Sequence, residues 1–178
     1  TTSTPIRILM VSTEYPPMQG GVGRYTYNLT KDLRKLGLDV QVVCNKLGNG
    51  EFSGLSPDNP ANSQVLLEIV EKIKPDLVHI QYEHGLYGLK LNPIYPKKTN
   101  TNIDSFYRLC KTPIITTFHS AYPFKQWLNL ITSFKDASKE NKLRRFSKNI
   151  LRYWKMLLNF HSFHNLNKEK LLRSKASI

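Results

Sequence analysis

Acidic residues and cysteines are both scarce in this chain of 178 residues. Only 13 Asp and Glu stand against 26 Lys and Arg, which gives a net charge of +13. Such an excess of positive charge indicates an anionic partner: a nucleic acid, a ligand that carries phosphate, or an anionic membrane surface. The two cysteines, Cys44 and Cys110, lie in apolar sequence without the spacing of metal ligands. This argues against a disulfide scaffold and a zinc module.

Long apolar runs and targeting signals are also missing. No stretch approaches the roughly 18 consecutive apolar residues of a membrane-spanning helix, and no basic leader followed by an apolar block opens the sequence. We therefore expect a cytoplasmic protein. Apolar residues make up 40% of the chain and charged residues 22%, a composition that favours one buried core over wholesale disorder.

Several motifs that would define a reaction are absent. There is no Walker lysine and no G-x-S-x-G elbow. The nearest match to a dinucleotide fingerprint is Gly21-x-Gly23-x-x-Thr26, which lacks the third glycine. His161 and His164 are three residues apart, but no carboxylate or cysteine completes a metal site. We therefore expect neither a metal ion nor a permanently bound cofactor.

Short apolar runs alternate with segments of helical periodicity in the first 120 residues. This repetition predicts an α/β fold, with a Rossmann-like parallel sheet and helices on both of its faces. Residues 48–62 read as a loop, and residues 91–105 as a long loop before a short helix. The strands are predicted at residues 6–12, 40–44, 77–82 and 113–118, and the helices at 22–36 and 65–73.

The apolar face of the first helix is predicted from its spacing. Val22, Tyr25, Leu29, Leu33 and Leu36 recur at steps of three and four, and a glycine follows where a helix commonly ends.

The composition changes after residue 120. Residues 135–178 hold 12 Lys and Arg against three acidic residues, and apolar residues recur at helical spacing from Leu143 to His161 through Phe146, Ile150 and Trp154. We predict a basic, helical C-terminal segment. Its apolar line either packs on the sheet or draws the protein to the inner face of an anionic membrane. The last residues, 175–178, look like the start of another strand.

Polar residues follow three of the predicted strands. Because ligands bind at the carboxyl ends of parallel strands, the residues that leave each strand are the site candidates. Glu14 and Gly20-Gly21 follow the first strand, and the glycines either approach a phosphate or form a tight turn with positive φ. Glu83 follows the third strand and His119 the fourth, each serving a ligand or simply meeting solvent. His79 lies within a strand, where a core role is the commoner one.

These strand exits resemble the N-terminal domain of GT-B glycosyltransferases of the family 4 type. The similarity lies in three motifs that keep the family's order along the chain. They are residues 6–12 with Tyr15-Pro16-Pro17 and Gly20-Gly21-Val22, residues 75–83 with Gly85-Leu86-Tyr87-Gly88, and residues 113–120.

The resemblance implies retaining transfer of a sugar from a nucleotide-diphosphate donor to a sugar, polysaccharide or lipid-linked acceptor, without a required metal. Gly20, Gly21 and Val22 would approach the donor diphosphate. His119 would hydrogen-bond the transferred sugar and, with Glu83, make up the catalytic pair. Glu83 would also face the acceptor side, which Glu14, Gln81 and His84 would line.

The family's second domain, with its E-x7-E motif and nucleotide pocket, does not occur in this sequence. We therefore expect residues 1–178 to be a single acceptor-side domain that pairs with its own C-terminal domain and is inactive alone. Two alternatives remain open, a basic nucleic-acid-binding domain and a non-catalytic interaction domain. Nucleic acid is the less favoured partner because the positive charge clusters in one helical region and no reader motif is recognisable.

Overall fold

The computed structural model describes residues 4–90, 100–120 and 142–177. The chain divides into two compact units. One, the sheet unit, comprises residues 1–89, 101–120 and 169–178, and the other, the helical unit, comprises residues 90–100 and 121–168.

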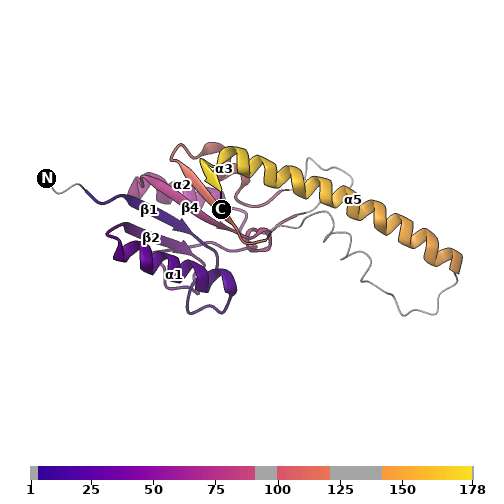
Figure 1. Cartoon of the computed structure of the whole chain (residues 1–178), viewed down its shortest axis with the longest axis horizontal. Helices are drawn as coiled ribbons and strands as arrows, with labels where there is room; N and C mark the ends of the chain where they lie inside the picture. The colour runs from indigo at the N-terminus through magenta and orange to yellow at the C-terminus, as the bar shows by residue number, and fades with distance from the viewer. Residues whose placement is uncertain (1–3, 91–99, 121–141, 178) are drawn as a thin grey trace. The chain divides into compact units, whose positions relative to one another are not determined.

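All six strands of the sheet unit are parallel and follow the spatial order β3-β2-β1-β4-β5-β6. This is the order of a doubly wound dinucleotide-type sheet, so the predicted α/β, Rossmann-like fold is confirmed (Figure 1). The strands are β1 (Arg7–Val11), β2 (Asp39–Cys44), β3 (Phe52–Ser53), β4 (Leu77–Tyr82), β5 (Ile114–Phe118) and β6 (Ala176–Ser177). The two-residue edge strand β3 lies within the segment predicted as a loop, and β6 confirms the strand start predicted at the end of the chain.

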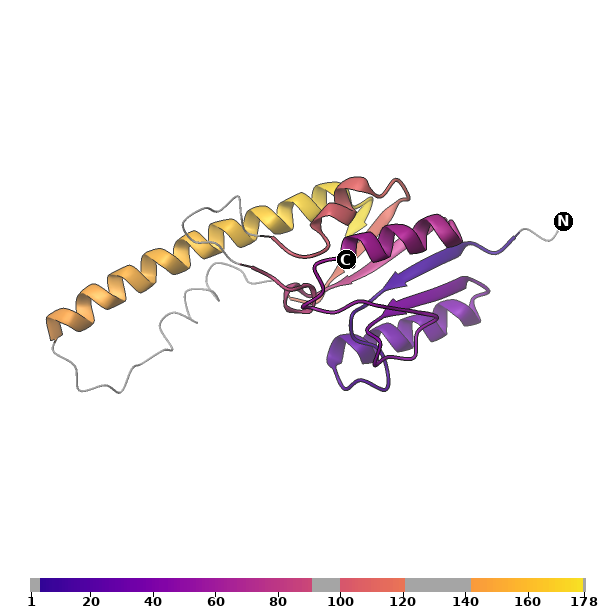
Figure 2. The same ribbon diagram turned by 180° about the vertical axis from the view of Figure 1, so that it is seen from behind.

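Helices cover both faces of this sheet, as predicted. Alternate residues of β1 and β2 pack against α1 (Gly21–Lys35) on one face and against α2 (Asn62–Ile73) and α3 (Asp104–Leu109) on the other. Figure 2 shows the same arrangement from behind. The first core centres on Leu9, Val11, Leu66, Ile80 and Phe106, and the second on Ile8, Met10, Val40 and Val42.

The buried stripe of α1 differs from the predicted one. Leu29 and Leu33 pack on the core, but Tyr25 is 45% exposed and Leu36 78% exposed. The fully buried residues of the helix are instead small ones, Gly23, Thr26 and Thr30. Small side chains let the helix backbone approach the end of β1, and this close approach turns Tyr25 away from the core.

Gly23 marks this approach most clearly. A Cβ at Gly23 would lie 3.2 Å from the backbone carbon of Glu14. The Thr26 hydroxyl donates to the Val22 carbonyl over 2.7 Å and lies 3.2 Å from the Ser12 hydroxyl at the end of β1. Helix α1 is thereby held against the exit of the first strand.

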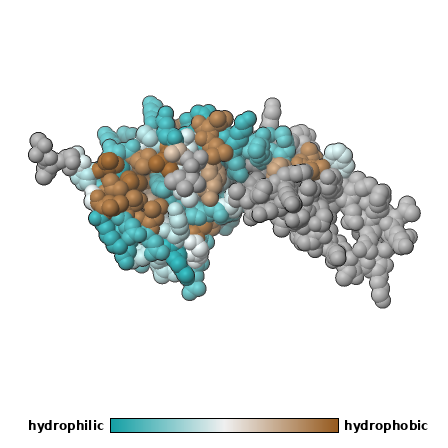
Figure 3. Space-filling view, in the orientation of Figure 1, coloured by the Kyte–Doolittle hydropathy of each residue, from teal (hydrophilic) through white to brown (hydrophobic). Residues whose placement is uncertain are grey.

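Some large apolar side chains of the sheet unit are not part of either core and remain exposed. Figure 3 shows a patch of hydrophobic side chains near the N-terminal end of the described chain, bordered by hydrophilic ones. Ile6 and Leu109 are among the large apolar residues that remain more than half exposed.

The basic C-terminal segment is helical, as predicted, but its helix is longer. Helix α5 runs from Lys142 to Arg173, and its last turn lies in the sheet unit. Trp154, on the predicted apolar line, is 60% exposed, whereas the side chains of Leu143, Phe146 and Ile150 lie outside the described residues. Within the described chain, no helix is both long and apolar enough to cross a membrane.

Candidate functional site at the carboxyl edge of the sheet

The candidate site lies where β1, β4 and β5 end side by side. These three strands are neighbours in the sheet, and the order of the strands reverses between β1 and β4. Ligands of doubly wound folds bind at such a reversal. The strand exits carry Glu14, Glu83 and His119, and the N-terminus of α1 lies beside the first of them.

Two contacts with residues of β4 hold His119 in place. Its backbone N–H donates to the Tyr82 carbonyl over 2.9 Å, and its imidazole Nε2 lies 2.9 Å from Gln81 Oε1. The Tyr25 ring meets the imidazole edge-on, with 5.1 Å between ring centroids. Burial lowers the pKa of His119, although the carboxylates of Glu83 and Glu14 oppose that shift. The imidazole is therefore neutral at neutral pH.

Of the two glycines at the start of α1, Gly20 lies in close approach to Glu14, and neither forms a turn with positive φ. Neither Gly20 nor Gly21 has positive φ, so the interpretation as a tight turn of that kind is wrong. A Cβ at Gly20 would overlap the Glu14 carboxylate, whereas the position of a Cβ at Gly21 is open. The Glu14 carboxylate accepts a long hydrogen bond of 3.4 Å from the Gly23 N–H. An anionic oxygen therefore already faces the first turn of α1, where the helix dipole favours negative charge.

Glu83 and His84 form a second cluster with Ser120. Glu83 accepts from the Gly85 N–H over 3.2 Å and from the Ser120 hydroxyl. The Nδ1 atom of His84 lies 3.3 Å from both Glu83 Oε1 and Ser120 Oγ. Burial lowers the pKa of His84, against the opposing effect of the neighbouring Glu83 carboxylate. The carboxylate of Glu83 is thus held in one orientation at the exit of β4.

Gln81 and His79 lie on the same face of β4 but not at the surface. Gln81 is fully buried, with its amide between His119 and the Met10 sulfur. His79 is 8% exposed and lies 2.8 Å from the Thr117 hydroxyl. Burial and the neighbouring His119 lower the pKa of His79 to about 4. His79 is therefore a neutral core histidine, in line with its position in the sequence.

The geometry places the predicted site residues at one edge of a doubly wound sheet, and a sequence comparison agrees with it. The profile of Glycosyltransferase Family 4 matches residues 19–164, which is most of the chain. The chain belongs to glycosyltransferase family 4. The predicted resemblance to the family's N-terminal domain is confirmed, and membership supports a glycosyltransferase function. No curated protein matches the sequence significantly.

Two residues of the candidate site in this family 4 domain have no clear signal in the sequence. The spacing of Tyr25 predicts one more member of the apolar stripe of a helix, whereas in the structure its ring contacts the His119 imidazole. A serine that follows a strand commonly caps the next helix, but the hydroxyl of Ser120 contacts Glu83 and His84. In the part of the chain that the structure describes, no group of three His, Cys, Asp or Glu side chains is arranged to hold a metal ion.

Proposed function

We propose that this family 4 domain is the acceptor side of a retaining glycosyltransferase of the hexosyltransferase type. It would move a sugar from a nucleotide-diphosphate donor to a sugar, polysaccharide or lipid-linked acceptor, together with its own C-terminal domain, which would hold the nucleotide. The observation that carries the proposal is the meeting of the α1 N-terminus, Glu83 and His119 at the edge where β1, β4 and β5 end.

The diphosphate would bind at the first turn of α1. Unpaired backbone N–H groups and the positive end of the helix dipole attract anions there. Gly20 and Gly21 allow a ligand to approach the backbone, and the space in front of Gly21 is open. The carboxylate of Glu14 now faces this turn and contacts Gly23 only over 3.4 Å, a weak bond that a phosphate oxygen would replace.

The transferred sugar would lie against His119, and the acceptor near Glu83, Glu14 and His84. In the reaction, the bond between the anomeric carbon and the diphosphate oxygen breaks, and a bond to the acceptor hydroxyl oxygen forms. The acceptor hydroxyl loses its proton, which we assign to the Glu83 carboxylate because the Gly85 N–H and the Ser120 hydroxyl donate to it and fix its orientation. Gln81 was predicted to line the acceptor side, but its full burial favours a role behind His119.

An anionic membrane surface is the partner we propose for α5, which would place the protein at the periphery of the inner face of the membrane. Residues 142–173 contain nine Lys and Arg and a single acidic residue, Glu169. Trp154 and Leu158 are exposed on the same helix. A basic helix with exposed apolar residues binds anionic interfaces, and a lipid-linked acceptor would be found there.

Calorimetric titration tests the proposed binding. The ligands are uridine and guanosine diphosphates, the corresponding nucleotide-sugars, and a single-stranded oligonucleotide, each at two salt concentrations. We expect at least one nucleotide-sugar to bind, and His119→Ala to weaken its binding. The matched control is His161→Ala, which removes an exposed histidine of the helical unit and should leave binding unchanged. Binding of the oligonucleotide alone would refute the proposal.

A further inference from the structure

The side-chain amide of Gln81 is unusual for a residue in the middle of a sheet. It is fully buried, and a buried amide is costly unless both of its ends are hydrogen-bonded. Its two partners are the Met10 sulfur, 3.3 Å from Nε2, and the His119 ring, whose Nε2 lies 2.9 Å from Oε1. A leucine or methionine would fill the same space and would need no hydrogen-bond partners. Packing alone therefore does not account for the amide.

The partners define which way the amide points. A thioether sulfur accepts hydrogen bonds weakly and donates none. The NH2 group of Gln81 therefore belongs on the side of Met10, since the opposite orientation would place the carbonyl oxygen against the sulfur, acceptor against acceptor. The carbonyl oxygen then faces His119 Nε2. A carbonyl oxygen only accepts, so Nε2 of His119 has to carry a proton.

The protonation of Nε2 determines the state of the second ring nitrogen of His119, Nδ1. In neutral imidazole only one nitrogen carries a proton, so Nδ1 of His119 keeps its lone pair. Among the described residues, Nδ1 has no hydrogen-bond partner. The groups that face the imidazole are the carboxylates of Glu83 and Glu14, the buried His79 and the edge of the Tyr25 ring.

We propose that Gln81 is a positioning residue that holds His119 in the Nε2–H tautomer, so that Nδ1 is the atom that accepts a hydrogen bond from a hydroxyl of the bound sugar. This inference rests on the proposed function for the identity of the ligand, but the tautomer itself does not. A neutral acceptor atom selects hydroxyl groups and offers nothing to a phosphate, which only accepts. His119 therefore recognises the sugar ring, and the diphosphate is left to the first turn of α1.

Nuclear magnetic resonance of the ligand-free protein with ¹⁵N-labelled histidine tests the tautomer directly. Two-bond ¹H–¹⁵N correlations distinguish the protonated from the unprotonated ring nitrogen, and His119→Asn identifies the His119 signals among the five histidines. We expect the Nε2–H form in the wild type. Gln81→Met, which removes both polar ends at similar volume, should give a mixture of tautomers. Gln81→Glu should keep Nε2–H and raise the pKa of His119 through its added negative charge.

Thr117→Val is the matched control. Thr117 pairs with Gln81 in the sheet and is also buried, but its hydroxyl contacts His79 rather than His119. The control should leave the tautomer of His119 unchanged. An Nδ1–H form in the wild type would overturn the proposal, as would a Gln81→Met spectrum identical to that of the wild type. If Gln81→Met fails to fold, the wild-type spectrum and the Gln81→Glu titration still decide.

Titration with uridine diphosphate glucose and with uridine diphosphate separates the inference from the proposed function. If the sugar ring adds affinity in the wild type, Gln81→Met should weaken nucleotide-sugar binding by roughly threefold to tenfold and leave uridine diphosphate unaffected, since one hydrogen bond is lost. An equal loss for both ligands would overturn the assignment of Nδ1 to the sugar. A wild type with the Nε2–H tautomer that binds no nucleotide-sugar in the wider panel would refute the function and leave the positioning of His119 intact.

Discussion

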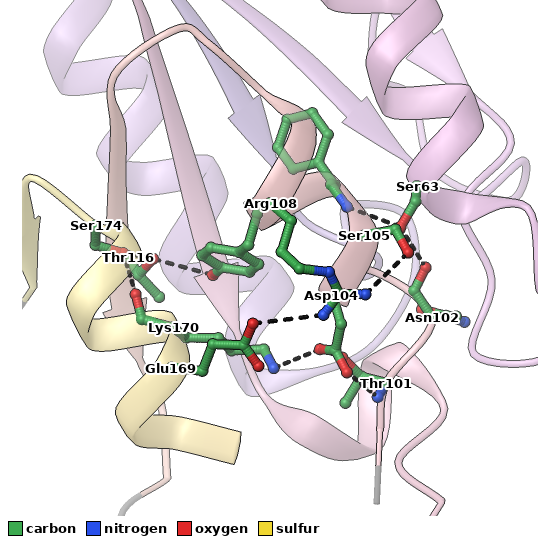
Figure 4. A network of polar contacts seen from close by, with 12 residues as sticks. Ser63, Thr101, Asn102, Asp104, Ser105, Arg108, Thr116, Glu169, Lys170 and Ser174 are labelled. Atoms are coloured by element: carbon green, nitrogen blue, oxygen red, sulfur yellow. Dashed lines mark hydrogen bonds and ion pairs between the residues drawn. The ribbon is translucent and has the colours of Figure 1, made fainter. Parts of the chain in front are cut away.

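Lys170 Nζ lies 2.6 Å from Asp104 Oδ1, and both side chains are almost completely buried, with 2% and 8% of their surfaces exposed. The pair joins the last turn of α5 to the first turn of α3 within the sheet unit (Figure 4). Asp104 also accepts two hydrogen bonds from Thr101, one from its N–H over 2.8 Å and one from its hydroxyl over 2.5 Å. The ammonium group lies 5.0 Å from the centre of the Tyr82 ring. Burial lowers the pKa of Lys170, and Asp104 opposes that shift.

Asp104 has two further hydrogen-bond donors from Thr101, whereas Lys170 depends on Asp104 for its ion pair. This difference predicts the effect of removing each partner. Asp104→Asn leaves the buried ammonium without its paired carboxylate, and we expect a loss of about 3–5 kcal/mol in the free energy of unfolding. Lys170→Met leaves Asp104 with its two Thr101 donors and fills the space with an apolar chain, so a smaller loss is expected. Urea denaturation measures both. Equal losses, or a larger loss for Lys170→Met, would contradict this account, and Lys168→Met serves as the control on an exposed lysine.

Acid should destabilise the sheet unit through His79. Its pKa is about 4 in the folded protein and about 6.5 in an unfolded chain, so the unfolded state binds more protons between these values. The free energy of unfolding should therefore fall as the pH drops from 6.5 to 4, by roughly 3 kcal/mol from this residue. The lowered pKa values of His84 and His119 act in the same direction.

Urea denaturation at several pH values measures this dependence. His79→Asn should flatten the curve between pH 4 and 6.5, and His161→Asn, at an exposed histidine, should not. A wild-type curve without a decrease in this window would mean that His79 can be protonated without cost in the fold.

The sequence predicts the sheet better than the site. Apolar runs mark β1, β2, β4 and β5 to within a residue or two, because a parallel strand buried on both faces needs apolar side chains on each. Strand β3 has only two residues, which is too few to show a periodicity, so the sequence does not predict it. The exposure of Tyr25 is not predicted, because helical spacing does not reveal which of two adjacent stripes faces the sheet. In α1 the buried stripe contains Gly23 and Thr26, whose small size allows a close approach. The full burial of Gln81 is not predicted either, because sequence alone does not reveal how deeply a polar strand residue is buried.

Glu14 and the first turn of α1 provide a test of the anion site. The Glu14 carboxylate faces the N–H of Gly23 and repels any anion that approaches there. Glu14→Gln keeps a hydrogen-bond acceptor but removes the charge, so inorganic pyrophosphate should bind several-fold tighter, most clearly at low salt. The pKa of His119 should also fall further, because Glu14 raises it.

The control for this prediction is Glu51→Gln. Glu51 is an exposed acid of the same sheet unit, paired with Arg34 at 2.7 Å, and its loss changes the net charge by the same amount. If both variants tighten pyrophosphate binding equally, the effect comes from net charge and not from the N-terminus of α1.

Helix α5 should bring the protein to anionic membranes. Nine basic residues and one acid along residues 142–173, with Trp154 and Leu158 exposed, predict co-sedimentation with vesicles that contain phosphatidylserine and none with purely phosphatidylcholine vesicles. Binding should weaken as salt rises, because added ions screen the attraction. Replacing both Arg144 and Arg145 with Glu should weaken vesicle binding strongly, and Trp154→Ala should weaken it more modestly through lost apolar contact.

The control is the double variant Lys31→Glu and Lys46→Glu, which changes the net charge equally in the sheet unit and should retain most of the binding. If this control loses as much binding as the α5 variant, or if neutral vesicles bind equally well, α5 is not the membrane-binding element.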